Sequence, residues 1–346
     1  MTESLFADLL LNLVVIGVSF LALNWASNLA ITNALKVSAI SQLGKTSVGF
    51  TLIAMSTTLP ELTVAVIAAT TDGAALSVGN VLGSNIFNIS CIIGLSALLI
   101  YLRPRKNKSE KRVELNVIPN LAKSELSNIH FGLFISSVVP MLLIYIATAT
   151  WLVGLILLLI FSGYMYSMSK VRLPSESEEV APEEKKKLKR YVVLTVGGAL
   201  GVVLSANFLV DSAVAIAESV GVPQTVIGAT IIAFGTSLPE LTVSLKSVLR
   251  GHSDLAFGNL IGASFINTTL ILGITFFVPQ LVGQPLTMNM NVFQNLVIFS
   301  IIVNLFFWYF LSREKIGWRE GAIFLFIYLL FLATTLGFIN PTAAVT

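Results

Sequence analysis

Charge is scarce in this chain of 346 residues, since Asp, Glu, Lys and Arg together make up only 11% of it. Soluble globular domains carry about 25% of these residues, so an ordinary soluble domain is excluded. Cysteine is nearly absent: Cys91 is the single thiol, which excludes a disulfide framework and a thiol-rich metal site. The N-terminal stretch MTESLFADLL lacks the basic residue and the cleavage pattern of a secretory signal, so we expect it to begin a permanent first span.

Apolar residues dominate instead, at 55% of the chain with a mean hydropathy of +0.87, which predicts an all-α polytopic membrane protein. A helix needs about 20 apolar residues to cross the hydrocarbon core of a bilayer. On that criterion the sequence contains ten segments, centred in residues 6–27, 45–70, 74–101, 130–148, 151–169, 191–213, 225–249, 254–279, 291–312 and 319–338. The fourth and fifth are the hardest to divide, because only Thr148, Ala149 and Thr150 mark a turn between them.

The positive charges test this count independently, because short cytoplasmic loops are enriched in Lys and Arg. All 21 Lys and Arg residues follow the first, third, fifth, seventh or ninth segment, and none falls on the other side. We therefore expect ten transmembrane helices with basic cytoplasmic loops and with the N- and C-termini outside. The short loops and the lack of a regulatory domain favour the plasma membrane of a prokaryotic cell.

One stretch of the chain occurs twice. The runs TLIAMSTTLPELTV (from Thr51) and GNVLGSNIFN (from Gly79) return as TIIAFGTSLPELTV and GNLIGASFIN at a constant offset of 179 residues. Each half contains five spans, an odd number, so the second half enters the membrane from the opposite side and the repeats are inverted. Inverted repeats with interrupted helices and a midplane site are the architecture of secondary transporters. We expect a first repeat over 1–170, a charged cytoplasmic linker over 171–190 and a second repeat over 191–346.

The linker contains SESEEVAPEEKKKLKR, which is polar and charged enough to predict a disordered connection between the halves. Its acidic run lacks the Gly and Asn spacing of a compact calcium loop, so we do not assign it to calcium sensing. Its basic residues are more simply a topology signal.

Each repeated stretch places a carboxylate inside apolar sequence. An ionisable residue in the middle of a span costs roughly 2.5 to 3.5 kcal/mol on insertion scales, so Glu61 and Glu240 are candidates for a functional site. In both copies an Asn follows the Glu after 27 positions, namely Asn88 and Asn267. Because the whole polar set recurs, a purely structural role for it is disfavoured.

Proline interrupts both copies just before the glutamate. Pro60 and Pro239 each remove a backbone donor and crowd the carbonyl four residues earlier, so we expect the helix to kink or unwind there. Freed carbonyl groups, such as those of Ala54 and Ala233, should then face a cavity, where irregular backbone is tolerated at membrane depth.

The polar groups of the two copies are all oxygen donors. The candidate ligands are Glu61, Glu240, Thr57, Thr236, Ser84, Asn88, Asn267, Ala54, Ala233, Thr58 and Ser237. Hard cations prefer such groups, and calcium accepts about 6 to 8 oxygens in flexible geometry. Two carboxylates neutralise one divalent ion, so the site without calcium needs monovalent cations or protons, which is the physical basis of exchange.

The motifs GTSLPEL and GN..G....N in two inverted copies resemble the alpha-repeats of the cation/calcium exchanger superfamily. The Thr-Ser-Leu-Pro-Glu form resembles its sodium/calcium exchanger branch more than the proton/calcium branch, whose repeats usually carry a Gly-Asn-Ala-x-Glu pattern. The resemblance covers the ten-span plan. It implies that the two repeat glutamates and the threonines four residues before them hold calcium, and that the first and sixth spans slide past the other eight. It also implies an internal-facing sodium site at Ala54, Thr57, Ser84 and Glu240 and an external-facing one at Ala233, Thr236 and Glu61.

Two departures from the family pattern bear on the coupling ion. The external-facing sodium site of the family also uses a serine where this chain has Ala263, which has no side-chain oxygen. A family member with well-defined sites often has Asp where this chain has Asn267, whereas Thr58 replaces a serine and keeps the hydroxyl. The usual three-sodium stoichiometry therefore does not follow directly for this chain.

These observations favour a secondary active antiporter that exports Ca²⁺ in exchange for Na⁺. Its expected partners are these ions, or H⁺, and the lipid bilayer, with no cofactor, no nucleic acid and no obligatory protein partner. An H⁺/Ca²⁺ antiporter stays open as an alternative because of Ala263 and Asn267, as does exchange with potassium coupling or with manganese or magnesium as substrate. An intramembrane enzyme is disfavoured, because no nucleophile, phosphate-binding loop or His partner accompanies the two glutamates. A channel uses similar oxygen ligands, but two kinked inverted helices favour a carrier.

Overall fold

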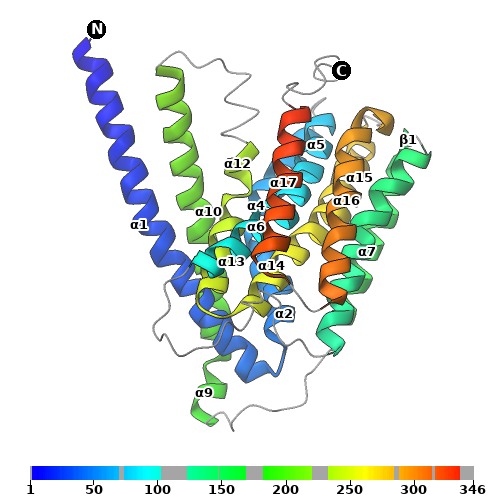
Figure 1. The fold of residues 1–346 in the computed structure, drawn as a ribbon, viewed down its shortest axis with the longest axis horizontal. Helices are drawn as coiled ribbons and strands as arrows, with labels where there is room; N and C mark the ends of the chain where they lie inside the picture. Colours follow the sequence, from blue (N-terminus) through cyan, green and yellow to red (C-terminus); the bar gives the residue numbers. More distant parts are fainter. Residues whose placement is uncertain are drawn as a thin grey trace.

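The computed structural model describes residues 2–69, 74–102, 123–146, 148–168, 182–219, 233–283, 288–313 and 316–335. Almost all of these residues are helical, and the helices form one bundle (Figure 1). Seven helices among the described residues are long and apolar enough to cross a bilayer, or eight if a bent pair counts as one span. Large apolar side chains such as Leu21, Leu76 and Val193 point outward from them, each more than 65% exposed, as lipid-facing positions require. The chain is a multi-pass membrane protein.

The elements follow one another as helices with very few interruptions. Before the linker they are α1 (Thr2–Ser41), α2 (Lys45–Val48), the π-helix η1 (Gly49–Ile53), α3 (Ala54–Thr57), α4 (Leu59–Ala69), α5 (Ala74–Ile86), the π-helix η2 (Phe87–Ile92), α6 (Ile93–Leu102), α7 (Lys123–Ile146) and α8 (Trp151–Met168). After it they are α9 (Pro182–Lys186), α10 (Leu188–Ser219), α12 (Ala233–Thr236), α13 (Leu238–Leu249), α14 (Ser253–Ile266), the π-helix η4 (Asn267–Ile271), α15 (Leu272–Leu281), the 3₁₀ turn η5 (Met290–Phe293), α16 (Gln294–Ser312) and α17 (Trp318–Thr335). Two short strands, β1 (Thr148–Ala149) and β2 (Met288–Asn289), pair antiparallel with Thr148 opposite Asn289.

Most of the expected spans can be located among these helices. The second is the bent pair formed by 45–57 and 59–66, and the fourth is a shorter apolar helix over 129–145. The predicted break between the fourth and fifth spans is confirmed, since β1 separates α7 from α8. The first part of the seventh, residues 225–232, lies outside the described residues, so the number of ten stays a prediction.

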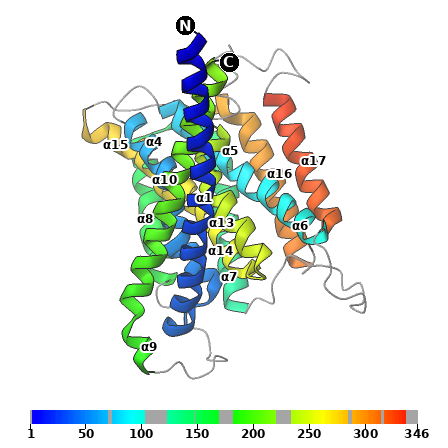
Figure 2. The ribbon, with the colours of Figure 1, turned by 90° about the vertical axis from the view of Figure 1, so that its left-hand side faces the viewer.

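The ends of the chain lie together in the bundle. The start of α1 and the end of α17 are at one end, and α9 is at the opposite end (Figures 1 and 2). This arrangement is what an even number of crossings gives. Which end faces the cytoplasm stays a prediction from the positions of Lys and Arg.

Helices α1 and α10 run in opposite directions and pack along each other at one side of the bundle (Figure 1). Their backbones come very close: a Cβ added at Gly198 would lie 2.6 Å from the backbone nitrogen of Ala30 and 2.9 Å from the carbonyl oxygen of Ala26. Small residues permit such an approach between transmembrane helices. Helix α1 also continues to Ser41, well past the expected end of the first span at residue 27.

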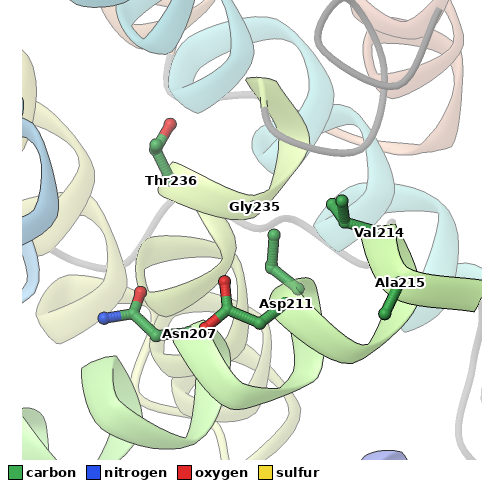
Figure 3. Close-up of a pocket in the computed structure, with 7 residues that line it drawn as sticks. Asn207, Asp211, Val214, Ala215, Gly235 and Thr236 are labelled. Atoms are coloured by element: carbon green, nitrogen blue, oxygen red, sulfur yellow. The ribbon is translucent and has the colours of Figure 1, made fainter. Parts of the chain in front are cut away.

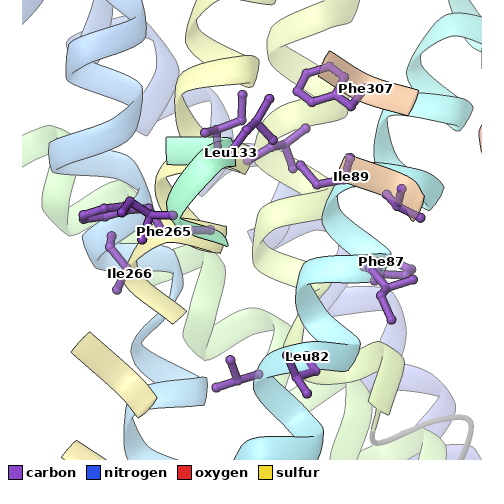
Figure 4. Packing of buried hydrophobic residues seen from close by; sticks show 14 of the residues in the cluster. Leu82, Phe87, Ile89, Leu133, Phe265, Ile266 and Phe307 are labelled. Atoms are coloured by element: carbon purple, nitrogen blue, oxygen red, sulfur yellow. The ribbon is translucent and has the colours of Figure 1, made fainter. Parts of the chain in front are cut away.

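The interior contains two apolar clusters. The larger one joins α5, η2, α7, α14 and α16, with Leu82, Phe87, Leu133, Phe265 and Phe307 among its members (Figure 4). The smaller one lies between the α1–α10 pair and the rest of the bundle. The α1–α10 pair is thus a separately packed layer beside the larger core.

The linker prediction was wrong for its last part, since α9 and the start of α10 are helical. Proline at the first position of α9, glutamates in its first turn and lysines in its last turn all favour a helix there. Glu184 accepts hydrogen bonds from Lys187 Nζ at 2.7 Å and from the Tyr191 hydroxyl at 2.5 Å. Residues 169–181 of the predicted disordered connection lie outside the described residues.

Candidate functional site

Both repeated stretches break at the residue two before proline. Thr58 (φ −81°, ψ 9°) separates α3 from α4, and Ser237 (φ −93°, ψ 8°) separates α12 from α13. The two parts of the first stretch are bent by 47°. The predicted kinks are confirmed, because Pro60 and Pro239 cannot donate to the preceding turn and each sits in the first turn of a new helix.

The carbonyl group of Ala54 is not free, contrary to prediction. It accepts the Thr58 N–H at 3.0 Å and the Thr58 hydroxyl at 2.8 Å. The reason is positional: proline removes the donor for the carbonyl four residues earlier, which is that of Ser56, and the turn before it stays closed. The side chain of Ala233 lies outside the described residues, and a role for its carbonyl group stays a prediction.

The break places each glutamate in the first turn of a helix and at the centre of the bundle. Glu61 in α4 and Glu240 in α13 are each only 1% exposed. The Glu61 carboxyl lies beside Ser84, the Glu240 carboxyl lies beside Thr57, and the two carboxyls are near enough to interact electrostatically. The helix N-termini favour negative charge, but this partial charge is small compared with two buried carboxylates.

Three of the four carboxylate oxygens have no hydrogen-bond partner among the described residues: Glu61 Oε2, Glu240 Oε1 and Glu240 Oε2. A buried charge without a partner costs many kcal/mol, and two like charges repel each other as well. The pair therefore requires a cation between the carboxyl groups or protons on them.

The two repeats contact each other through equivalent side chains. The Thr57 hydroxyl donates to Asn259 Oδ1 at 3.3 Å, and the Thr236 hydroxyl donates to Asn80 Oδ1 at 3.3 Å. The offset of 179 residues converts each of these contacts into the other. The predicted threonines thus come from opposite repeats, and Asn80 and Asn259 join them at the site.

A second pair of equivalent positions differs between the repeats. The Ser237 hydroxyl donates to Ser84 Oγ at 3.1 Å. The corresponding positions in the other direction are Thr58 and Ala263, and alanine offers no oxygen. Thr58 instead donates to the backbone within its own helix, so this side of the site lacks one hydroxyl contact between the repeats.

The asparagines behind the threonines also differ. Asn259 Nδ2 donates to Ser244 Oγ at 3.0 Å. The position equivalent to Ser244 is Ala65, and Asn80 Nδ2 has no hydrogen-bond partner among the described residues. The second repeat therefore holds its asparagine more firmly than the first.

The remaining predicted ligands, Asn88 and Asn267, lie one layer away on the π-helical turns η2 and η4. Asn267 Nδ2 donates to Asn85 Oδ1 at 3.2 Å, and Asn85 Nδ2 donates to the Thr268 hydroxyl at 3.0 Å. The Oδ1 atoms of Asn88 and Asn267 have no hydrogen-bond partner among the described residues. Such π-helical turns are frequent at functional sites.

Asn85 bridges the repeats although the sequence did not single it out. It is 2% exposed, next to Ser84 in the chain, and the equivalent position in the second repeat is Ser264. Its polarity within an apolar run was the available signal. Because the two repeats carry different residues there, a search for matched pairs overlooks it.

The donor set suits hard cations. No group of three or more His, Cys, Asp or Glu side chains that could hold a metal ion occurs within the described ranges. Two carboxyl groups, hydroxyls and amide oxygens therefore make up the available ligands. Oxygen ligands of this kind bind calcium and sodium more readily than transition metals.

Comparison with known proteins gives matches over nearly the whole chain. The family model described as sodium/calcium exchanger protein matches residues 11–170 and 190–337. An uncharacterized membrane protein of Methanocaldococcus jannaschii is 31% identical over 287 residues, which are 83% of this chain and 85% of that protein. The sodium/calcium exchanger MaX1 of Methanosarcina acetivorans is 25% identical over 323 residues, covering 82% of this chain and 87% of MaX1.

The fold is also similar to a solved structure. The sodium-calcium exchanger NCX_Mj, soaked with 10 mM Na⁺ and no Ca²⁺, superimposes with a TM-score of 0.78 at 26% identity. The match covers 94% of this chain and 99% of that one.

Proposed function

Because the chain belongs to the sodium/calcium exchanger family, we propose that it exports Ca²⁺ across the plasma membrane in exchange for Na⁺. Relatives of similar length that have been named for an activity are exchangers, which supports cation/calcium exchange for this chain. Calcium as cargo, sodium as the coupling ion and export as the direction are the specific parts of the proposal. In it, both termini face outward and the basic loops face the cytoplasm.

One observation carries the proposal: two buried glutamates from opposite repeats meet, and most of their oxygens have no partner in the protein. A divalent cation between Glu61 and Glu240 would neutralise both charges and use the oxygens that the protein leaves unpaired. The hydroxyls of Thr57 and Thr236 and the backbone near Ala54 and Ala233 complete the proposed ligand set. When calcium leaves, monovalent cations take over the task of neutralising the carboxylates.

Alternating access is supported by the packing of α1 against α10. This pair contacts the rest of the bundle through its own apolar cluster, next to the breaks at Thr58 and Ser237. Sliding of the pair along the larger core would open the site to one side and then to the other. The helix breaks are the places where such a motion meets the ion ligands.

A second candidate, exchange of calcium for protons, is favoured by one observation. Ala263 leaves Thr58 without a hydroxyl partner from the other repeat, so one sodium ligand of the family is missing. Two protons on Glu61 and Glu240 would neutralise the site as well as sodium does. Coupled transport with protons would then be electroneutral.

The deciding experiment is uptake of radioactive calcium into proteoliposomes. One set is loaded with sodium, and a matched set has only an outward proton gradient. Glu61→Gln and Glu240→Gln serve as the site variants in both sets. Uptake that requires internal sodium and is lost in both variants supports the proposal, whereas uptake driven by protons alone supports the second candidate.

The same vesicles report stoichiometry through a potassium diffusion potential. If one net charge moves per cycle, an imposed 100 mV contributes about 2.3 kcal/mol and changes the accumulation of calcium accordingly. Accumulation that ignores the potential indicates an electroneutral cycle. Uptake that survives both glutamine substitutions would refute the site, and transport that never proceeds against a gradient would refute exchange.

A further inference from the structure

A cavity of about 360 Å³ lies between α10 and α12, beside the proposed ion site. Figure 3 shows Asn207 and Asp211 on α10 and Gly235 and Thr236 on α12, which line it. Thr236 links the cavity to the ion site, because it stands one helical turn before Glu240. A water molecule needs only about 10 to 15 Å³ of such space, so the cavity has room for a hydrated ion.

Asp211 is a carboxylate within an apolar helix that crosses the membrane. It is exposed, and no Lys, Arg or His of the described residues forms an ion pair with it. Asn207 is one turn earlier on the same face, and Figure 3 shows its amide next to the Asp211 carboxylate. An ionisable group at such a position marks a functional site more often than a structural one.

The internal symmetry of the chain shows what this pair of side chains holds elsewhere. The offset of 179 residues, extended into α1, matches Asn207 with Asn28 and Asp211 with Thr32. In α1 this pair accepts hydrogen bonds from a cation. Arg250 donates to Asn28 Oδ1 through Nη2 and to Thr32 Oγ1 through Nη1, the latter at 3.3 Å.

The α10 pair has no counterpart of that arginine. The position matched with Arg250 is Thr71, which is neutral. At the same time the neutral Thr32 of α1 is replaced by the negative Asp211 on α10. The second position is therefore more attractive to a cation than the first and is not supplied with one by the sequence.

Glycine in α12 keeps the cavity next to the ion site. A Cβ added at Gly235 would lie 2.5 Å from Val210 Cγ2 and 2.8 Å from its Cγ1. The missing side chain lets α12 approach α10 directly beside Asp211. Thr236 is thereby held against the cavity.

We propose that Asp211 and Asn207 bind a hydrated hard cation in this cavity, as a waiting site on the route to Glu240. The proposal rests on the exchange function proposed above. One carboxylate and one amide oxygen cannot replace the hydration shell, so the site binds weakly and admits both Na⁺ and Ca²⁺. Its role is to raise the local concentration of cations, as charged clefts do.

The binding test does not require transport. Equilibrium dialysis in a neutral detergent, with radioactive Ca²⁺ and separately with radioactive Na⁺, is carried out on the variant that combines Glu61→Gln and Glu240→Gln. We expect a weak residual site in this variant that disappears when Asp211→Asn is added. Asp8→Asn is the matched control, because Asp8 is an exposed carboxylate on the neighbouring helix α1 and does not line the cavity.

The transport test uses the otherwise native chain. Asp211→Asn should raise the cation concentration for half-maximal uptake by about tenfold at low ionic strength, the lower end of the effect of charged clefts. The increase should shrink in concentrated choline chloride, and the maximal rate should stay unchanged. An unchanged half-maximal concentration, residual binding that persists after Asp211→Asn, or equal effects of Asp8→Asn would overturn the waiting site. Absence of any coupled uptake would instead count against the exchange function, and the dialysis result would still decide on the site.

Discussion

Gly258 in α14 lies against the backbone of α2, and this contact leads to a stringent prediction. A Cβ added there would lie 2.1 Å from the carbonyl oxygen of Thr46 and 2.9 Å from its Cα. The obstructing atoms belong to the backbone, so no rotation of a side chain relieves the contact. We predict that Gly258→Ala forces α14 and α2 apart and destabilises the protein.

The magnitude follows from the distances. An ordinary contact of a Cβ begins at 3.4 Å, so the helices must separate by about 1.3 Å. Overpacking of this kind costs about 1 to 3 kcal/mol, and a rigid backbone neighbour favours the upper end. Alanine also gains about 1 kcal/mol over glycine in a helix, which partly conceals the cost.

Gly163→Ala in α8 is the control that removes the propensity term. No atom of the described residues lies within 4 Å of a Cβ at Gly163, so this variant has only the helix gain. The difference between the two variants then isolates the overpacking cost, about 1 to 3 kcal/mol.

Thermal unfolding in detergent, followed by tryptophan fluorescence at one heating rate, measures this difference. A fixed heating rate matters because unfolding of such proteins is often irreversible. We expect Gly258→Ala to unfold several degrees below Gly163→Ala. Equal midpoints for the two variants would refute the close approach of α14 to α2.

Three further predictions concern the site and its surroundings. Ala263→Ser restores a hydroxyl opposite Thr58, so we expect a several-fold lower sodium concentration for half-maximal exchange; no change in sodium dependence would argue against a role for this position. Lys246→Met removes donors to the α1 backbone carbonyl and side chains that Lys246 contacts at 2.5 to 3.0 Å, and should weaken the α1–α13 contact by about 1 kcal/mol, seen as faster hydrogen exchange in the middle of α1 but not in α17. Hydrogen bonds from Lys187 and Tyr191 hold the pKa of Glu184 below its ordinary value, so the contribution of these bonds to α9 is present at neutral pH and is lost as the pH falls through that lowered pKa. Acid should therefore speed hydrogen exchange in α9 of the native chain, and Glu184→Gln should abolish this pH dependence.

The sequence was sufficient where a feature depends on local chemistry or on the repeat. Proline near Glu61 and Glu240 has one steric consequence, and the kinks at Thr58 and Ser237 follow from it. The offset between the repeats likewise indicated that their polar groups meet.

Features that depend on contacts between distant segments were not predictable in this way. Asn85 became part of the site because Asn267 and Thr268 of the other repeat face it, and no local pattern specifies that. The length of α1 depends on packing against α10 and not on hydropathy. The helix in 182–186 was overlooked because its charges indicated a solvated chain, whereas Pro182 and the Glu–Lys order stabilise a helical turn.

The unequal hydroxyls of the two repeats have a consequence for how the carrier responds to its two compartments. Duplicated halves with identical ligands would present the same site to either side of the membrane, and the half-saturating ion concentrations would be equal on both faces. Ala263 opposite Thr58, and Ala65 where the other half has Ser244, remove that equivalence. The gradients still set the net direction, but we expect the two faces to saturate at different concentrations. The chain would then act as a kinetic rectifier whose polarity was fixed by two alanines after the duplication.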